Sequence, residues 1–361
     1  MLFGPGPSDV APSVLDAMSR PVIGHLDPAF VALLDDIGAM LRDVFLTRNE
    51  VTFAVSGTGS AGMEMALVNT LEPGDRAVVG VAGVFGERLA EIARRCGADV
   101  EEVRAEWGSP VPSEAIEAAL KRAPAKLVAI VHAETSTGMR QPIEELAELT
   151  LGNDALLVVD AVTSLAGIPV QVDGWGIDVC YSGTQKCLSV PPGLSPVTFS
   201  PRAMEAIRAR KTAVRSWYLD VGMITRYWGA ERVYHHTAPI SMLYALHEGL
   251  RLVLDEGLEQ RWERHETLGA ELHATLSEQG FELLAAGGYR LPQLTAAALP
   301  GGRDERALRA RLLNEFGIEV GGGLGAFAGR AWRIGLMGES CRKDKLDRLL
   351  VAIKTVLGNT V

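Results

Sequence analysis

Two ionisable side chains lie where strand-like segments of the sequence end. Asp160 closes the apolar run at residues 155–160, and Lys186 follows the run at residues 179–182. Because ligands bind at strand ends in α/β sheets, we expect both side chains in one site. A lysine that can bind an aldehyde and a carboxylate that can hold a protonated ring nitrogen are what pyridoxal phosphate requires. Taken singly, the two residues are more simply interpreted as a surface lysine and a helix-capping aspartate.

A glycine-rich segment could hold the phosphate of such a cofactor. Ser56-Gly-Thr-Gly-Ser60 joins a strand-like run to a helix that we expect to begin near Ala61. A helix N-terminus presents unpaired amides and a partial positive charge, and glycine lets the backbone approach an anion closely. Thr58, Gly59 and Ser60 are therefore candidate phosphate donors. Ordinary helix capping by Thr58 or Ser60 explains the motif equally well when it is considered alone.

The motifs, taken in order, resemble the class V aminotransferases, particularly the alanine–glyoxylate and serine–glyoxylate branch. Ser182-Gly-Thr-Gln-Lys186 is similar to the segment that carries the cofactor lysine in that family. The likeness covers nearly the whole chain through Gly4-Pro-Gly-Pro-Ser8, Thr47-Arg-Asn49, Ser56-Gly-Thr-Gly59, Glu72-Pro-Gly-Asp75, Glu134-Thr-Ser-Thr-Gly138, Tyr234-His-His-Thr237, Gly321-Gly-Gly-Leu-Gly325 and Arg333-Ile-Gly-Leu-Met-Gly338. The resemblance implies the type I fold of pyridoxal phosphate enzymes, with pyridoxal 5′-phosphate at Lys186 and Asp160 and its phosphate at residues 58–60.

The resemblance also assigns roles around the cofactor ring. Phe85 takes the place of an aromatic residue, frequently tryptophan, that stacks on the pyridine ring, and Val162 would face the opposite side of that ring. Thr135 matches a residue whose hydroxyl reaches the cofactor and substrate, while Gln185 would orient the site beside the lysine. A core phenylalanine and a loop with internal side-chain bonds are the alternative interpretations for Phe85 and Thr135. We expect the nearby His132 to be structural or to support residues that contact the cofactor.

Further residues are assigned to the substrate and to a neighbouring chain. Arg333 would bind the substrate carboxylate, because a guanidinium forms a two-pronged contact that lysine cannot copy. Gly6 would offer a backbone amide to the same carboxylate. By resemblance, Tyr234 and Thr237 reach across a dimer interface to the phosphate of the neighbour. The simpler alternatives are a salt-bridged surface arginine for Arg333 and an interdomain loop for Tyr234 and Thr237.

The helices and strands that must position these residues follow two different patterns along the chain. From residue 51 to 200, strand-like runs alternate with helical ones, which predicts crossover units, a mostly parallel sheet and an α/β fold. We expect strands at residues 52–56, 76–80, 127–132, 155–160, 179–182 and 197–200, and helices at residues 60–71, 85–96, 112–122 and 142–151.

Beyond residue 240 the pattern changes to long helices mixed with short strands. Residues 241–256 read as one helix, followed by a helix to about residue 279, strands near 281–284, 294–299, 318–320 and 331–334, and helices at 304–316 and 342–356. This mixture predicts a smaller α+β domain. We therefore expect a large cofactor-binding domain at residues 1–240, including the N-terminal segment, and a linking helix with a small domain at residues 241–361.

Composition excludes several classes of partner. The chain has 361 residues, and its 35 basic and 45 acidic side chains give a net charge of −10, which argues against nucleic acid or an anionic membrane as a partner. No run of about 18 apolar residues and no signal-peptide pattern are found. The four dispersed cysteines have neither metal-type spacing nor a disulfide pattern. A cytoplasmic protein is expected.

The predicted activity is transfer of the amino group of a small L-amino acid, alanine or serine, to a small 2-oxo acid, most simply glyoxylate. The predicted assembly is a homodimer with shared active sites and no metal. Related alternatives are an aminophosphonate transaminase, which would want extra basic residues, and a pyridoxamine–pyruvate transaminase, which would not need a phosphate pocket. A cysteine desulfurase would need a cysteine on a mobile loop, and Cys341 lies beside a helix start instead. A non-catalytic cofactor-binding regulator usually carries a basic DNA-binding extension, which is absent here.

Overall fold

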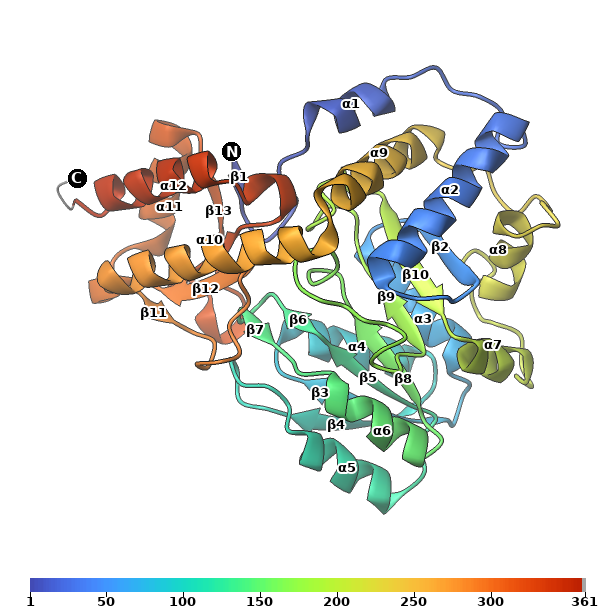
Figure 1. The fold of residues 1–361 in the computed structure, drawn as a ribbon. Coiled ribbons are helices and arrows are strands. Elements are labelled where there is room, and N and C mark those ends of the chain that lie inside the picture. The colour runs from blue at the N-terminus through green and yellow to red at the C-terminus, as the bar shows by residue number, and fades with distance from the viewer. Residues whose placement is uncertain (359–361) are drawn as a thin grey trace.

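The computed structural model describes residues 1–358, and its larger part is built on a seven-stranded sheet (Figure 1). All neighbouring strands are parallel except β10, which runs antiparallel to both of its neighbours. The strand order is β2 (Val51–Ser56), β10 (Leu194–Phe199), β9 (Val179–Tyr181), β8 (Leu156–Asp160), β5 (Leu127–Val131), β3 (Arg76–Val81) and β4 (Asp99–Arg104).

Helices cover both faces of this sheet, because successive strand side chains point to opposite faces and both sets are apolar. In β8, Leu157 and Val159 join one buried cluster while Leu156 and Val158 join another. The first cluster includes residues of α1 (Pro12–Met18), α2 (Pro28–Phe45), α5 (Ser113–Arg122), α6 (Glu144–Gly152) and α9 (Ile240–Glu256). The second includes residues of α3 (Gly59–Thr70), α4 (Val84–Arg95), α7 (Pro201–Arg208) and α8 (Val221–Trp228).

The smaller part of the molecule is a five-stranded, mainly antiparallel sheet with its own buried cluster. Its strand order is β1 (Leu2–Phe3), β13 (Glu319–Gly322), β14 (Ala331–Gly335), β12 (Leu294–Ala298) and β11 (Glu282–Leu283). Helices α10 (Leu258–Glu278), α11 (Glu305–Phe316) and α12 (Lys343–Val356) accompany it, and a short hairpin of β6 (Ala133–Glu134) and β7 (Met139–Arg140) lies apart from both sheets. Figure 1 shows α10 and α12 side by side on this part.

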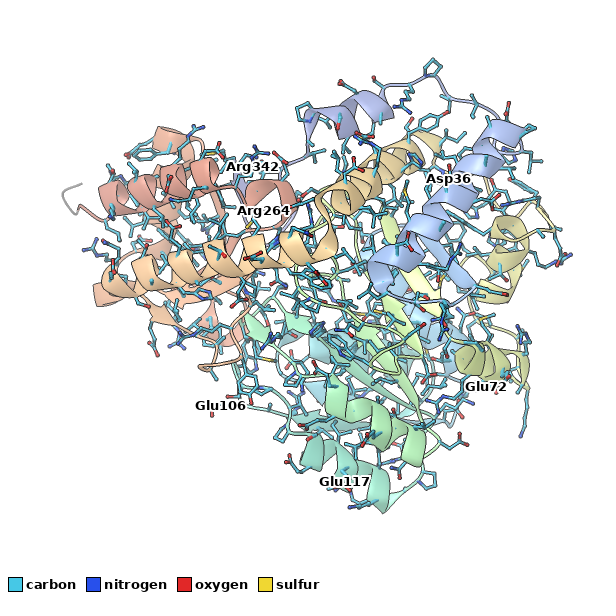
Figure 2. All side chains as sticks on the ribbon, viewed as in Figure 1. Asp36, Glu72, Glu106, Glu117, Arg264 and Arg342 are labelled. Atoms are coloured by element: carbon cyan, nitrogen blue, oxygen red, sulfur yellow. The ribbon has the colours of Figure 1, made fainter. Side chains whose placement is uncertain are left out.

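Basic side chains of α10 connect the two parts. The buried Arg261 donates through Nε to the Ala166 carbonyl and through Nη2 to the Cys187 carbonyl, 2.5 Å away. Arg264, labelled in Figure 2, pairs with Glu256 and donates to the Gly338 carbonyl at 3.1 Å. These contacts tie the loop that carries Lys186 to the loop that follows β14. They therefore help to set the distance between residues from the two sheets.

The α/β class and the mostly parallel sheet are confirmed, and each predicted strand and helix corresponds to an observed element within a few residues. Several elements had not been predicted, namely helices α1, α2, α7 and α8, strands β1 and β4, and the hairpin of β6 and β7. Strand β4 is the edge of the large sheet and reads Asp-Val-Glu-Glu-Val-Arg. Its charged residues form ion pairs, such as Arg94 with Glu102, instead of filling a core. An apolar run, the usual strand signal, is therefore missing from it.

The domain boundary at residue 240 stays a prediction. The N-terminal segment was expected in the large domain, but its first strand lies elsewhere. Leu2 and Phe3 pair in parallel with Glu319 and Val320, so the first strand belongs to the smaller sheet. The chain then crosses to the large part, and the segment between the two passes Lys186. Among the described residues, no helix combines the length and the apolar character needed to cross a membrane.

Candidate active site

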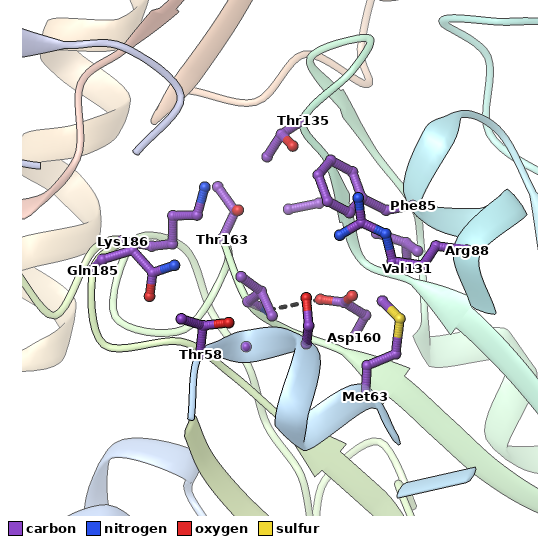
Figure 3. Close-up of a pocket in the computed structure, with 14 residues that line it drawn as sticks. Thr58, Met63, Phe85, Arg88, Val131, Thr135, Asp160, Thr163, Gln185 and Lys186 are labelled. Carbon is purple, nitrogen blue, oxygen red and sulfur yellow. Dashed lines mark hydrogen bonds between the residues drawn. The ribbon is translucent and has the colours of Figure 1, made fainter. Parts of the chain in front are cut away.

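A cavity lies at the carboxyl end of the parallel strands, where the sequence had placed the chemistry. Figure 3 shows Lys186 and Gln185 on one side of it and Phe85, Arg88 and Asp160 on the other, with Asp160 below the Phe85 ring in this view. Its lining residues come from segments far apart in the sequence: Thr58, Gly59, Ser60, Met63, Phe85, Arg88, Val131, Ala133, Thr135, Asp160, Val162, Thr163, Gln185 and Lys186. Every predicted site residue is in this set except Gly6, Tyr234, Thr237 and Arg333.

Asp160 is the last residue of β8, and its carboxylate is 4% exposed. One oxygen accepts from the Val162 amide at 2.8 Å, and the other accepts from the Tyr181 hydroxyl at 3.0 Å. Burial raises the pKa of Asp160 to about 6, because removal from water disfavours the charged form more than these hydrogen bonds favour it. A positively charged partner is therefore needed to stabilise the carboxylate fully.

Lys186 faces the cavity from the loop after β9. Its amine donates to the Pro5 carbonyl, and the Ser8 hydroxyl donates to the Lys186 carbonyl at 3.0 Å. Gly6, whose φ is +114°, permits this approach, because a β-carbon there would lie 2.7 Å from Lys186 Nζ. Burial and the nearby Arg333 lower the pKa of Lys186 from 10.5 to about 8. The amine is thus neutral in a substantial fraction of molecules near physiological pH.

The N-terminus of α3 opens into the cavity. The helix begins at Gly59, and the preceding Thr58 makes no side-chain capping bond, so its hydroxyl is not occupied by the helix. A β-carbon at Gly59 would lie 2.8 Å from Val162 Cγ2, which shows how closely the backbone lines the pocket. Gln185 Oε1 is buried without a hydrogen-bond partner within residues 1–358. Unpaired helix amides and free hydroxyls are donors that suit a phosphate ester, whereas the Gln185 oxygen is an acceptor and needs a donor from elsewhere.

Five lining residues were not predicted from the sequence, namely Met63, Arg88, Val131, Ala133 and Thr163. Tyr181, which donates to Asp160, was not predicted either. Arg88 has a readable signal, because it follows Phe85 by three residues on α4 and therefore lies on the same helix face. Its guanidinium carbon lies 4.9 Å from the centre of the Phe85 ring. Tyr181 is part of an apolar strand, and only the fold places its hydroxyl against Asp160.

Arg333 reaches the site from the smaller sheet. It lies in β14, opposite Ala296 and Gly321, and its Nε donates to the Gly322 carbonyl at 2.8 Å. In the described part of the chain no hydrogen bond of its two terminal nitrogens is observed, so the fork of the guanidinium is free. Its positive charge acts on Lys186 and lowers the pKa of that amine. Arg333 is not among the residues that line the cavity, so its binding of the same ligand as Lys186 stays a prediction.

Tyr234 and Thr237 do not line the cavity. Both are exposed in the segment between α8 and α9, with Tyr234 at 56%, and their hydroxyls lie 3.5 Å apart. A single chain thus does not bring them to Lys186. Their assignment to a neighbouring chain remains a prediction.

Buried histidine and cysteine side chains fit structural roles. His132 packs edge-on against Trp175, and burial lowers its pKa to about 3. All four cysteines are free and buried, and burial raises the pKa of Cys341 to about 11. A thiol nucleophile needs the opposite environment, which argues against a desulfurase. The described residues contain no group of three or more His, Cys, Asp or Glu side chains arranged to hold a metal ion.

Comparisons with known proteins agree with this geometry. A family model described as aminotransferase class-V matches residues 1–336. The (S)-ureidoglycine–glyoxylate transaminase of Bacillus subtilis is 42% identical over 374 residues, which cover 99% of this chain and 90% of that protein. The alanine–glyoxylate aminotransferase of Felis catus is 40% identical over 361 residues, covering 99% and 87%. A crystal structure of alanine–glyoxylate aminotransferase from Nostoc sp. superposes with a TM-score of 0.97 at 50% identity, covering 99% of this chain and 94% of that one. The chain is therefore a transaminase with the type I fold, and it belongs to the class-V aminotransferases.

Proposed function

We propose that the chain is a pyridoxal 5′-phosphate-dependent aminotransferase that moves the amino group of a small L-amino acid, alanine or serine, to glyoxylate. The observation that carries the proposal is the pairing of Lys186 and Asp160 in one cavity at the N-terminus of α3. Glyoxylate is named as a substrate by the relatives from Bacillus subtilis, Felis catus and Nostoc sp.. A cytoplasmic location belongs to the same proposal, because free, buried cysteines suit a reducing compartment.

The residues present fit the cofactor from both of its ends. Thr58, Gly59 and Ser60 would bind the phosphate, and Gln185, whose Oε1 can only accept a hydrogen bond, would orient the site beside Lys186. Asp160 would hold the proton of the ring nitrogen, and this contact supplies the positive partner that its buried carboxylate lacks. Phe85 and Val162 would enclose the ring. When bound, the cofactor supplies an electron-withdrawing ring that stabilises the charge left at the α-carbon of the substrate.

Lys186 would anchor the cofactor and then act as the base. A base works best when its pKa is near the working pH, and burial with the charge of Arg333 brings the pKa of Lys186 to about 8. Its neutral amine would take the proton from the α-carbon of the amino donor and hold it at Nζ. Thr135 lies at the same cavity and would contact the substrate with its hydroxyl.

Arg333 would select substrates that have a carboxylate. Its two terminal nitrogens match the two oxygens of a carboxylate, which neither lysine nor a neutral donor can reproduce. The Gly6 segment lies against Lys186 and would offer a backbone amide to the same group. Amino donor and oxo-acid acceptor would share this anchor in turn, because both are small α-substituted acids.

The proposed assembly is a homodimer in which Tyr234 and Thr237 complete the phosphate site of the neighbour. Both hydroxyls are exposed in one chain, and an exposed pair of this kind needs a second surface to bind a ligand well.

A donor and acceptor panel tests the proposed function. The purified protein should bind pyridoxal 5′-phosphate and convert glyoxylate to glycine with alanine or serine as donor, with ping-pong kinetics. (S)-Ureidoglycine is the second donor candidate, because the Bacillus subtilis relative is named for it. Pyridoxamine with pyruvate is the control for the alternative that needs no phosphate pocket. Cofactor binding without turnover of any pair would contradict the proposed activity.

A further inference from the structure

Helix α4 begins without a cap from its own segment. The residue before it, Gly83, has no side chain, yet the first amides of the helix are all bonded. The Val84 amide donates to the Ser136 hydroxyl at 3.1 Å, and the Phe85 and Gly86 amides donate to one oxygen of Glu134 at 3.2 and 3.3 Å. The cap therefore comes from a loop about 50 residues further along the chain.

The Glu134 carboxylate is fully buried between this helix and its own loop. Its second oxygen accepts from the Ser136 amide at 3.2 Å and from the Ser136 hydroxyl at 2.6 Å. A buried carboxylate is costly unless donors surround it, and here backbone amides, a hydroxyl and the positive end of α4 all face it. One oxygen thus serves the helix alone, while the other serves the loop and also accepts a longer bond, 3.5 Å, from the Phe85 amide.

Gly83 makes this contact possible. A β-carbon at residue 83 would lie 2.4 Å from Ser136 Oγ and 2.6 Å from Glu134 Cδ. Glycine is therefore required because the loop approaches the helix start so closely, and not because of its backbone angles. The three residues Gly83, Glu134 and Ser136 form one unit, which we call the α4 clamp.

Both segments joined by the α4 clamp carry walls of the active-site cavity. The first turn of α4 carries Phe85, and Arg88 follows one turn later. The loop carries Thr135 between Glu134 and Ser136. We propose that Glu134 is a positioning residue that fixes the position of the Phe85 ring relative to the Thr135 hydroxyl. In this way it would set how tightly the cofactor ring is bound. This inference rests on the proposed function for its ligand, whereas the clamp itself can be measured without any ligand.

Amide hydrogen exchange in the cofactor-free protein tests the clamp directly. Glu134→Gln keeps one oxygen but presents an NH₂ group to donors, and Glu134→Ala removes both acceptors. Exchange at residues 84–86 should accelerate about tenfold in the glutamine variant and further in the alanine variant, as expected for a lost cap. The matched control is Glu106→Gln at an exposed glutamate that is labelled in Figure 2 and does not line the cavity, and this variant should leave exchange unchanged.

Cofactor titration by absorbance and fluorescence tests the consequence. Dissociation constants for pyridoxal 5′-phosphate should rise about tenfold in Glu134→Gln and more in Glu134→Ala, and the circular dichroism of the bound ring should change. A variant that melts at a lower temperature but keeps wild-type affinity and ring dichroism would overturn the proposal in favour of a purely structural role.

If Glu134 variants fail to fold, Ser136→Ala gives the same test more gently. It deletes the donor to Glu134 and the acceptor for Val84 while leaving the carboxylate, so exchange and affinity should change about threefold. Wild-type values for Ser136→Ala would then overturn the proposal. Failure of the wild-type protein to bind the cofactor would instead contradict the proposed function, and the exchange data would still decide whether the clamp exists.

Discussion

The Lys186–Asp160 pair and the Tyr234–Thr237 pair were both predicted to contact the cofactor, but they differ in how far they are buried in one chain. Asp160 is 4% exposed and Lys186 faces an enclosed cavity, whereas Tyr234 is 56% exposed and Thr237 is also at the surface. Burial shifts the pKa of Asp160 upward and that of Lys186 downward, so both move toward neutrality. The two groups with shifted pKa values therefore lie together within one chain. The exposed hydroxyls of Tyr234 and Thr237 can contribute only if another surface covers them.

The largest effect is expected at Lys186. Lys186→Ala removes both the covalent anchor and the base, so turnover should fall by about 10⁴-fold or more, and the absorbance of the covalently bound cofactor should disappear. Absorbance spectra and rate measurements check this, and Lys211→Ala is the control at an exposed lysine. If borohydride reduction fixed the cofactor to Lys211 instead, the assignment of Lys186 would be wrong.

Asp160→Asn should have the next largest effect. The amide keeps the shape but loses the charge that holds a proton on the ring nitrogen, and each unit lost from the pKa of that nitrogen corresponds to about 1.4 kcal/mol. Removing one preorganised charge partner typically costs about 10²–10³-fold in rate. Single-turnover rates check this, with cofactor content measured in parallel. A variant with near-normal rates would disprove the electrostatic role of Asp160.

Arg333→Leu should weaken amino donor and oxo acid together, by about ten- to several-hundred-fold in kcat/KM. Glyoxylate offers little besides its aldehyde and carboxylate, so a charged anchor must supply most of its binding. Arg333→Lys should recover only part of the loss, because ammonium cannot form the two-pronged contact. Cofactor content should stay unchanged. Wild-type kinetics in the leucine variant would locate the carboxylate anchor elsewhere.

The pH dependence of cofactor capture follows from the lowered pKa of Lys186. Only the neutral amine can add to an aldehyde, and below a pKa of about 8 its fraction falls about tenfold for each pH unit. The capture rate should therefore rise from pH 6 to 8 and level off above pH 8. Stopped-flow absorbance with the cofactor-free protein measures this. A rate that still rises tenfold between pH 9 and 10 would mean that burial does not lower the pKa of this amine.

The smallest effect is expected for Tyr234→Phe and Thr237→Val, each of which removes one hydroxyl and should weaken cofactor binding about two- to tenfold. Mixing a Lys186 variant with a Tyr234 variant tests whether the two residues act in the same chain. A heterodimer of Lys186→Ala and Tyr234→Phe chains has one wild-type site only if Tyr234 acts on the neighbour. Recovery of wild-type cofactor affinity in the mixture supports shared sites, and its absence in a stable heterodimer excludes them.

Most strands of the large sheet were predictable because each is a run of neighbouring apolar residues. Strand β5 is apolar throughout and β8 is apolar up to its last residue, Asp160, so both are typical of buried parallel strands. Edge strand β4 was missed because its charges are satisfied by ion pairs, and α2 was missed although Asp27 caps it and Pro28 opens it, a signal that was present. Strand β1 could not have been assigned to the smaller sheet, since its partner Glu319–Val320 lies more than 300 residues away.

The sequence by itself determined the α/β class, and it predicted that Lys186, Asp160 and the helix start at residues 58–60 share one site, which agrees with their place in one cavity. These follow from the order of short motifs and from strand-end positions, which are properties of neighbouring residues. Only the tertiary structure decided that Tyr181 donates to Asp160, that Pro5 and Gly6 enclose the Lys186 amine, and that Glu134 caps a helix 50 residues earlier. Such contacts join distant segments, and they depend on distances that the folded chain alone creates.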